Sequence, residues 1–280
     1  MDNLKRVVAI NDISCVGRCS LTVALPIISA AGIECSILPT AILSTHTGGF
    51  TGYTFLNLSD EMDKIVKHWK DLDLRVDTLY SGYLGSENQI DQVKNIFASF
   101  PKAKRVVDPA MADNGKMYPA FDLQFAKKMG SLCDGADVIL PNITEACFMC
   151  GIDYVDGVQS KEYIDKLLNA CLDLGAKNVC LTGVALENGK IGAATISKDN
   201  KKVFYYALDK IDGYFHGTGD VFASCFVSAY TLGKDIEECA KISCDITVKA
   251  ICETINRSQD IKYGVNFELT LDELYKSLNK

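Results

Sequence analysis

The sequence has little of what marks several classes of protein. Only 6 of its 280 residues are proline and 21 are glycine, and no tract is of low complexity, which excludes a collagen-like or largely disordered chain. Positive charge is also scarce: 29 basic against 36 acidic residues give a net charge of −7. This balance argues against duplex nucleic acid as the main partner, because neutralising its phosphates needs a basic face. With 48% hydrophobic residues it can still bury a full core.

No segment predicts a leader or a membrane span. The N-terminus (MDNLKRVVAIND) turns polar again at Asn11, which is too early for a signal peptide. The most apolar stretch, Leu21 to Leu43, is interrupted by two prolines, a glycine and a glutamate, so we expect a helix, a turn and a buried strand there. A chain of this length does not need disulfides to fold. We therefore expect its 12 cysteines to be reduced thiols of a cytoplasmic protein.

Several well-known functional motifs are missing. No GxxxxGK[ST] phosphate loop occurs, no GxGxxG follows the first predicted strand, and no GxSxG elbow is present. Cys147 and Cys150 form a lone CxxC without a second pair, so we do not expect zinc or redox chemistry there. The three histidines are too scattered for a metal triad, although the polar loop around His46 is a plausible part of a site.

Short apolar runs rich in β-branched residues recur along the chain and predict strands. They are Arg6–Asn11, Cys35–Leu43, Thr78–Leu84, Arg105–Asp108, Asp137–Pro141, Asn178–Val184, Ile191–Ser197 and Val203–Leu208. Amphipathic helical segments lie between them, such as Leu58–Lys70, with Ser59 as its N-cap, and Ser160–Leu174. Further helices are expected at Asp220–Leu232, Asp235–Asn256 and Leu271–Leu278.

This alternation predicts an α/β protein in three layers, with a mostly parallel central sheet covered by helices on both faces. Only residues 198–202 separate the last two strands, so we expect a hairpin and an antiparallel edge. No linker, repeat or charge block marks a boundary. We predict one domain over residues 1–280.

Polar residues follow most of the predicted strands. They are Asn11–Asp12, Ser44–Gly49, Ser81–Tyr83, Asp108, Asn142 with Glu145, and Thr182–Gly183. In open α/β sheets, ligands bind beyond the carboxyl ends of the strands. These residues therefore predict a binding site at one rim of the sheet.

The segment His216-Gly217-Thr218-Gly219-Asp220 directly precedes an apolar helix. Its small residues let the backbone amides of 217–219 converge on an anion, and the helix N-terminus adds partial positive charge. Asp220, at the first helical position, would face that anion and accept a proton from a hydroxyl nucleophile. Alternatively, Asp220 only caps the helix and the glycines make a tight turn. The segment alone leaves both interpretations open.

A second group of polar residues is suited to a metal ion. Asp108 and Asp113 follow one predicted strand, and Asn142 and Glu145 follow the next. Magnesium prefers hard oxygen ligands and takes one or two carboxylates together with phosphate oxygens and water. Each residue taken singly could be a helix cap or a solvated acid. Their positions after successive strands favour a shared site.

Four motifs together resemble the pyridoxal kinases of the ribokinase superfamily. They are LYSGYLGS at 79–86, VDPAM at 107–111, PNITE at 141–145 and GTGD at 217–220. They occur in the family's order and spacing from about residue 5 to the last long helices. The resemblance implies a ribokinase-like α/β/α sandwich that phosphorylates the 5′-hydroxymethyl group of a B6 vitamer with ATP. It also implies Mg²⁺, a monovalent cation such as K⁺, and a homodimer.

The resemblance also implies roles for individual residues. Asp220 would be the general base, and the amides of Gly217, Thr218 and Gly219 would stabilise the transferred phosphoryl group. The nucleotide would contact Asp108, Asn142, Glu145, Thr182, Gly183 and Thr218. The metal would lie near Asp108, Asp113 and Glu145. The B6 substrate would contact Asp12, Thr47, Tyr83 and Asp220.

The chain departs from the family pattern at Asp12, where pyridoxal kinases carry a serine that touches the pyridine ring. An acid there would favour a protonated ring nitrogen. The VDPAMAD stretch at 107–113 also has alanine where many relatives have glycine. The loop that would hold magnesium therefore departs from the family pattern.

Three other functions stay open. A hydroxymethylpyrimidine kinase or a sugar kinase would use the same anion site and base. The single glycine of residues 12–18 and the short segment 44–58, which has room for no more than a hairpin, favour B6 over both. A non-catalytic protein that binds a B6 vitamer or a nucleotide is the alternative of another class.

Overall fold

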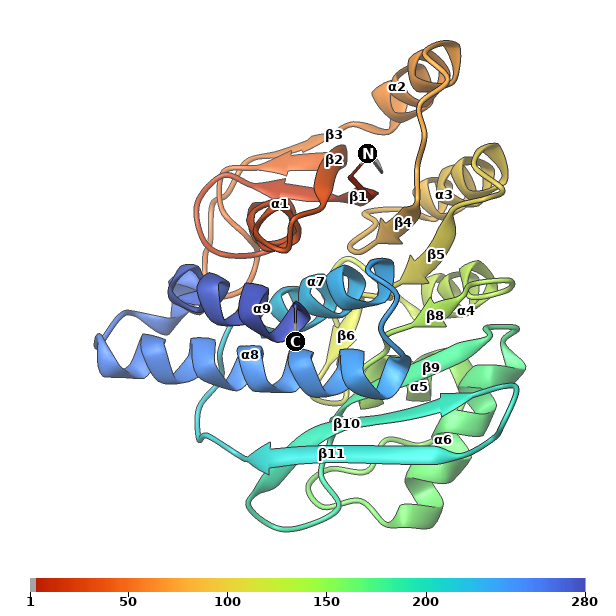
Figure 1. Ribbon diagram of the computed structural model, residues 1–280. Helices are drawn as coiled ribbons and strands as arrows, with labels where there is room; N and C mark the ends of the chain where they lie inside the picture. Colours follow the sequence, from red (N-terminus) through yellow and green to blue (C-terminus); the bar gives the residue numbers. More distant parts are fainter. Residues whose placement is uncertain (1–3, 280) are drawn as a thin grey trace.

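The computed structural model describes residues 4–279, which place helices on both faces of one sheet (Figure 1). Within these residues the sheet has nine strands in the order β11-β10-β9-β8-β5-β4-β1-β2-β3. They are β1 (Arg6–Ser14), β2 (Glu34–Leu43), β3 (Phe55–Asn57), β4 (Thr78–Ser81), β5 (Lys104–Val107), β8 (Val138–Ile139), β9 (Asn178–Val184), β10 (Lys190–Ser197) and β11 (Val203–Asp209). A separate small hairpin joins β6 (Ala112–Asp113) to β7 (Lys116–Met117).

The helices lie in the connections between strands and at the C-terminal end. They are α1 (Leu21–Ala30), α2 (Ser59–Asp71), α3 (Glu87–Ser99), α4 (Leu123–Leu132), α5 (Ile143–Cys150), α6 (Lys161–Asp173), α7 (Thr218–Thr231), α8 (Ile236–Asn256) and α9 (Leu271–Leu278). Two short 3₁₀ turns, η1 (Ile261–Tyr263) and η2 (Phe267–Thr270), precede α9. No helix within residues 4–279 is both long enough and apolar enough to cross a membrane.

The strand directions confirm the predicted sheet. The strands from β2 through β1, β4, β5 and β8 to β9 run parallel to their neighbours. Strand β10 is antiparallel to both β9 and β11, which gives the expected antiparallel edge. At the opposite edge, β3 pairs antiparallel with β2. We did not predict β3, because three exposed residues show no periodicity.

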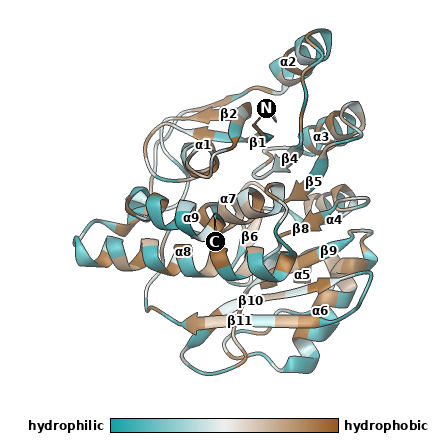
Figure 2. Cartoon of the chain, viewed as in Figure 1, coloured by the Kyte–Doolittle hydropathy of each residue, from teal (hydrophilic) through white to brown (hydrophobic). Residues whose placement is uncertain are grey.

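Alternate residues of each strand enter two separate cores. In β1, Val8 and Ile10 pack into the core under α2 to α6, whereas Val7 and Ala9 pack into the core under α1, α7, α8 and α9. Hydrophobic and hydrophilic residues alternate along the helices α2 and α8 in Figure 2, as expected for helices with one buried side. The sheet is therefore buried on both faces, and polar groups can reach solvent only at its rims.

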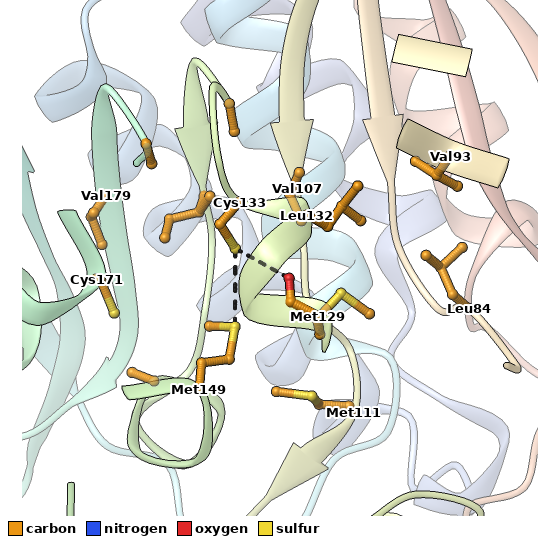
Figure 3. Close-up of a cluster of buried hydrophobic side chains, with 14 of the residues drawn as sticks. Leu84, Val93, Val107, Met111, Met129, Leu132, Cys133, Met149, Cys171 and Val179 are labelled. Atoms are coloured by element: carbon orange, nitrogen blue, oxygen red, sulfur yellow. Dashed lines mark hydrogen bonds between the residues drawn. The ribbon is translucent and has the colours of Figure 1, made fainter. Parts of the chain in front are cut away.

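Sulfur atoms fill part of the core under α2 to α6 (Figure 3). The thiol of Cys133 lies 3.7 Å from the carbonyl oxygen of Met129 and 4.0 Å from the sulfur of Met149. On the same side, the sulfur of Cys147 lies 3.1 Å from the Tyr163 hydroxyl, which joins α5 to α6. Most of the cysteines pack as small apolar residues, which is the usual behaviour of a buried thiol.

The predicted starts of α2 and α7 are wrong, whereas that of α6 is confirmed. Ser59 is the first residue of α2, and its hydroxyl accepts a hydrogen bond from Gln89 instead of capping the helix. Helix α7 begins at Thr218, so Asp220 occupies its third position. Ser160 does cap α6, because its hydroxyl accepts the Tyr163 N–H at 3.2 Å.

The sheet reverses its strand order between β1 and β4, because β2 follows on one side of β1 while β4, β5 and β8 follow on the other. Ligands of open α/β sheets bind at such a switch point. Here the side chain of Asn11 spans it: its Oδ1 accepts the N–H of Tyr83 at 2.8 Å and that of Asp12 at 3.0 Å. Gly82 leaves room for this side chain, since a Cβ there would collide with Asn11.

We expect Asn11→Ala to lower the free energy of unfolding by about 1–3 kcal/mol, because two buried N–H groups lose their acceptor. Urea unfolding followed by circular dichroism measures the change. Asn95→Ala, on an exposed turn of α3, is the matched control and should be neutral or slightly stabilising. Equal stability of both variants and the unmodified protein would contradict this role of Asn11.

Candidate active site

The first turn of α7 forms an open cradle of backbone amides. Gly217 precedes the helix with φ 78° and ψ 0°, a left-handed conformation that favours glycine. A side chain at Gly217 would also collide with the carbonyl oxygen of Arg18, so this segment fits closely against the helix start. A Cβ on Gly219, in contrast, would meet nothing within 4 Å. The first N–H groups of a helix have no partner inside it, so this turn offers donors that a phosphate group can accept.

Asp220 lies partly buried in this turn and does not cap the helix, since the capping position belongs to Gly217 and no side chain caps α7. Burial raises the pKa of the Asp220 carboxyl to about 7. The backbone N–H of Ser20 opposes this increase in pKa, and the nearby charge of Asp12 contributes to it. A carboxylate with a pKa near neutrality beside an amide cradle is equipped to accept a proton.

Asn142 and Glu145 form a reciprocal capping box at the start of α5. The Asn142 side chain accepts the N–H of Glu145, and the Glu145 carboxylate accepts the N–H of Asn142, each at 2.9 Å. Glu145 also accepts the Met111 N–H at 3.0 Å, which joins it to the segment after β5. The Asn-x-x-Glu spacing is the sequence signature of this box, and our sequence analysis missed it.

Three predicted acids gather at the ends of β5 and β8. Burial, with the nearby charges of Glu145 and then Asp220, holds the pKa of Asp108 well above its usual range. Burial raises the pKa of Glu145 to about 7. Asp113 lies on the small hairpin, where burial raises the pKa of its carboxyl and its oxygens accept hydrogen bonds from Asn114.

These carboxyls fit a magnesium ion that also binds phosphate and water. No group of three acidic, histidine or cysteine side chains within residues 4–279 encloses a metal position on its own. However, the mutual repulsion of the buried Asp108 and Glu145 is what a divalent cation would relieve. Magnesium often binds in this way, through one or two carboxylates and substrate phosphates.

The loop between β2 and β3 approaches the amide cradle through two histidines. The ring centroids of His46 and His216 lie 5.1 Å apart, and Gly48 packs against His216. Nδ1 of His46 accepts the Gly48 N–H at 3.2 Å, so Nε2 carries the hydrogen and donates to the carbonyl oxygen of Lys262 at 2.7 Å. Thr47 is exposed in this loop, within one residue of both contacts. The sequence alone did not indicate the pairing of these histidines.

The remaining predicted residues lie along the same rim. Tyr83 is half-buried, with its ring 5.5 Å from that of Phe121. Thr182 and the exposed Gly183 lie near the end of β9, where Thr182 forms a backbone bridge to Asn142. Asp12 is only 5% exposed, at an irregularity in the pairing of β1 with β2.

The fold and this rim define a small-molecule kinase of the ribokinase type, with an amide cradle and a carboxylate at the start of one helix. A model of the phosphomethylpyrimidine kinase family matches residues 25–264. The chain belongs to this family, which groups it with pyridoxal and hydroxymethylpyrimidine kinases.

Similar proteins carry both of these activities in their names. A crystal structure from Bacteroides thetaiotaomicron, assigned as a phosphomethylpyrimidine kinase and solved in a form with pyridoxal, is 33% identical with a TM-score of 0.91 and covers 97% of this chain and 96% of that one. The pyridoxal kinase of Lactobacillus plantarum is 28% identical with a TM-score of 0.90, covering 98% of each chain. The hydroxymethylpyrimidine/phosphomethylpyrimidine kinase of Haemophilus influenzae is 25% identical over 92% of this chain and 95% of its own length.

We expect Asp220→Asn to stabilise the protein at pH 8 when nucleotide and metal are absent. The raised pKa means that the folded state favours the protonated carboxyl, so its contribution to stability is full below the ordinary pKa of 3.8 and is lost as pH rises to about 7. The gain from the uncharged amide should therefore be largest above pH 7 and fade towards pH 4. Urea unfolding at several pH values measures it.

Asp199→Asn, in an exposed turn, is the control and should leave stability nearly unchanged at each pH. A destabilised Asp220→Asn protein at pH 8 would contradict the cost that we assign to this buried carboxylate.

Proposed function

We propose that this kinase transfers the γ-phosphoryl group of ATP to the 5′-hydroxymethyl group of a B6 vitamer: pyridoxal, pyridoxamine or pyridoxine. The observation that carries the proposal is the position of Asp220 in the first turn of α7, partly buried beside free amides. A protein that only bound these ligands would gain nothing from a costly carboxylate at a phosphate site.

The reaction follows from the chemistry of these groups. Asp220 takes the hydroxyl proton, the substrate oxygen bonds to the γ-phosphorus, and the bond from that phosphorus to the bridging oxygen of ADP breaks. The N–H groups of the Gly217–Asp220 turn donate to the oxygens of the transferred group, and the α7 N-terminus adds its partial positive charge. Such phosphoryl transfer depends mainly on positioning and electrostatics.

The nucleotide and its cation would occupy the rim between the α7 cradle and the ends of β5, β8 and β9. We assign nucleotide contacts to Asp108, Asn142, Glu145, Thr182, Gly183 and Thr218. Asp108, Asp113 and Glu145 would hold Mg²⁺ directly or through water, and the ion would neutralise phosphate charge. The capping box limits Asn142 and Glu145 to the lone pairs that it leaves free. The K⁺ ion and the homodimer that the resemblance implies stay predictions.

The substrate would bind between the β2–β3 loop and the end of β4. Thr47 is exposed in that loop and Tyr83 is half-buried after β4, on either side of the switch point. The pyridoxal named with the Bacteroides thetaiotaomicron structure supports a B6 substrate. Contact between Asp12 and a ring nitrogen stays a prediction, and both oxygens of Asp12 already accept hydroxyl hydrogen bonds from Ser14 and Ser20.

A hydroxymethylpyrimidine kinase is the second candidate. The family model and the relative from Haemophilus influenzae favour it. The two substrates both present a hydroxymethyl group on a flat nitrogen heterocycle, so the same base and cradle would serve either one. Only the residues around the ring distinguish them.

The test is ADP release from Mg-ATP, with and without K⁺, against pyridoxal, pyridoxamine, pyridoxine, hydroxymethylpyrimidine and ribose. We expect turnover with the B6 compounds. Asp220→Asn should lower kcat by at least about 10²-fold while ATP binding, measured by calorimetry, is retained. Asp212→Asn, in the exposed turn before α7, is the control and should keep full activity.

Turnover confined to hydroxymethylpyrimidine or ribose would contradict the proposed B6 substrate, while the proposed mechanism would still hold. Nucleotide binding without turnover of any compound would favour a binding protein. Joint loss of binding and turnover in Asp220→Asn would indicate a structural role for this residue.

We expect Gly219→Ala to separate stability from activity. Its methyl group would project into open space and alanine favours a helix, so the variant should be as stable as the unmodified protein or more so. The same methyl group would occupy part of the phosphate space, so kcat/KM for ATP should fall by about tenfold or more. Steady-state kinetics beside thermal unfolding measure both, and unchanged kinetics would exclude the first turn of α7 as the phosphate site.

A further inference from the structure

Gln89 is a fully buried polar residue in the first turn of α3. It is 0% exposed and occupies the third helical position, where its N–H donates to the hydroxyl of the N-cap Ser86 at 3.3 Å. In a complete capping box, the side chain at this position would accept the N–H of the N-cap residue. Here its Oε1 accepts the N–H of Gly85 instead, at 2.7 Å. The side chain of Gln89 therefore reaches out of the helix into the segment that follows β4.

The amide nitrogen of Gln89 contacts two further elements. Nε2 donates to the carbonyl oxygen of Thr40 in β2 at 2.9 Å and to the hydroxyl of Ser59 at the start of α2 at 3.0 Å. The Thr40 carbonyl can only accept and the Gly85 N–H can only donate, so the carboxamide has a single orientation. One buried side chain therefore joins α3, β2, α2 and the segment of residues 82–86.

The 82–86 segment carries Tyr83, whose backbone is fixed by hydrogen bonds to β1 and β2. The Tyr83 N–H donates to Oδ1 of Asn11 at 2.8 Å, and the Tyr83 carbonyl oxygen accepts the hydroxyl of Thr40 at 3.2 Å. A Cβ at Gly85 would lie 3.7 Å from the ring of Tyr83 and 3.5 Å from the ring of Phe55 in β3. Gly85 therefore lies beside both rings, so a displaced Gly85 would change the space next to them.

Packing alone does not explain a glutamine at this position. A fully buried carboxamide is costly to desolvate, and an apolar side chain would fill the same space between α2 and α3. What only the carboxamide supplies is the direct link from β2 to the Gly85 N–H. Buried polar networks whose groups are all paired hold the backbone in one conformation. The backbone that Gln89 holds is the one next to Tyr83.

We propose that Gln89 is a positioning residue for the B6 substrate: it holds the 82–86 segment against β2, so that Tyr83 lies in place to contact the heterocyclic ring. The proposal rests on the proposed function, because it takes Tyr83 to line the substrate site. Gln89 itself is buried and acts only through this segment. The amide cradle and Asp220 belong to another segment, so Gln89 affects substrate binding more than phosphoryl transfer.

The experiment compares Gln89→Met with Gln92→Met. Methionine is unbranched and flexible, so it can fill the space of either glutamine without making its hydrogen bonds. Gln92 is 8% exposed on the same helix, and its Nε2 donates to the carbonyl oxygen of Ser59 at 2.9 Å and to Asp63 at 3.0 Å. Both acceptors belong to α2, so Gln92→Met weakens the contact between α2 and α3 but leaves the 82–86 segment held.

We expect KM for the B6 substrate to rise by about tenfold or more in Gln89→Met, since small misplacement of a contacting group has effects of this size. KM for ATP and kcat should stay near those of the unmodified protein. Gln92→Met should keep all three constants, even if it unfolds at a lower urea concentration. An unchanged substrate KM in Gln89→Met, or equal increases in both variants, would overturn the proposal.

A second variant keeps the proposal testable if Gln89→Met does not fold. Thr40→Val is similar in size and removes only the hydroxyl that donates to the Tyr83 carbonyl oxygen, leaving α3 intact. Because it releases the same segment at one contact, substrate KM should rise while kcat and KM for ATP are kept. In that case a normal substrate KM in Thr40→Val would overturn the proposal.

Hydrogen exchange tests the contact without turnover. Oε1 of Gln89 protects the Gly85 N–H, so mass spectrometry should find faster amide exchange over residues 82–86 in Gln89→Met than in the unmodified protein or in Gln92→Met. Unchanged exchange in Gln89→Met would overturn the proposal even if no compound of the panel were phosphorylated. Faster exchange together with a silent panel would leave the contact standing and contradict only the proposed function.

Discussion

Burial of both faces of the sheet is the constraint on which the rest of this structure depends. Strand β1 sends Val8 and Ile10 into one core and Val7 and Ala9 into the other, so none of its first residues can serve a ligand. A polar side chain within these buried strands needs a hydrogen-bond partner. Asn11, in the second half of β1, accepts the N–H groups of Asp12 and Tyr83 and so joins β1 to the segment after β4. The site is therefore the part of the sheet that the helices cannot cover.

Carboxyl groups at this rim lower the stability of the folded protein. A partly buried carboxyl whose pKa is raised to about 7, as at Asp220, makes the folded state less stable at neutral pH. Repulsion between Asp108 and Glu145 adds a second cost of the same kind. Bound phosphate and a divalent cation would change the net charge around Asp220 and around the pair Asp108 and Glu145. Charged groups that lower the stability of the folded protein in this way are typical of sites that act on a ligand.

Close contacts bring distant segments of the chain together around the site. The carbonyl oxygen of Arg18 lies against Gly217, at the start of α7. The contact between His46 and Lys262 joins the β2–β3 loop to the turn before α9. These contacts join segments that are about 200 residues apart in the sequence. Replacing Gly217 or His46 would therefore disturb both of the segments that the residue joins.

Much of the fold was predictable because it is local. The strand β9 and the helix α9 have the predicted bounds, and the antiparallel edge follows from the short turn at 198–202. The edge strand β3 escaped prediction because it is three exposed residues long, and Ser59 was misjudged because a distant glutamine takes its hydroxyl. The capping box at Asn142 was visible as a spacing and was overlooked.

The sequence by itself determined the fold class, the motifs of the rim and the residue types of the candidate site, because periodicity and spacing are local properties of the chain. It pointed to Asp220 but left open whether that residue caps α7. Only the tertiary structure decided this, by giving the capping position to Gly217. It alone also paired His46 with His216 and joined the hydroxyl of Ser20 to Asp12. Such contacts arise when distant segments pack together, and no pattern within either segment contains them.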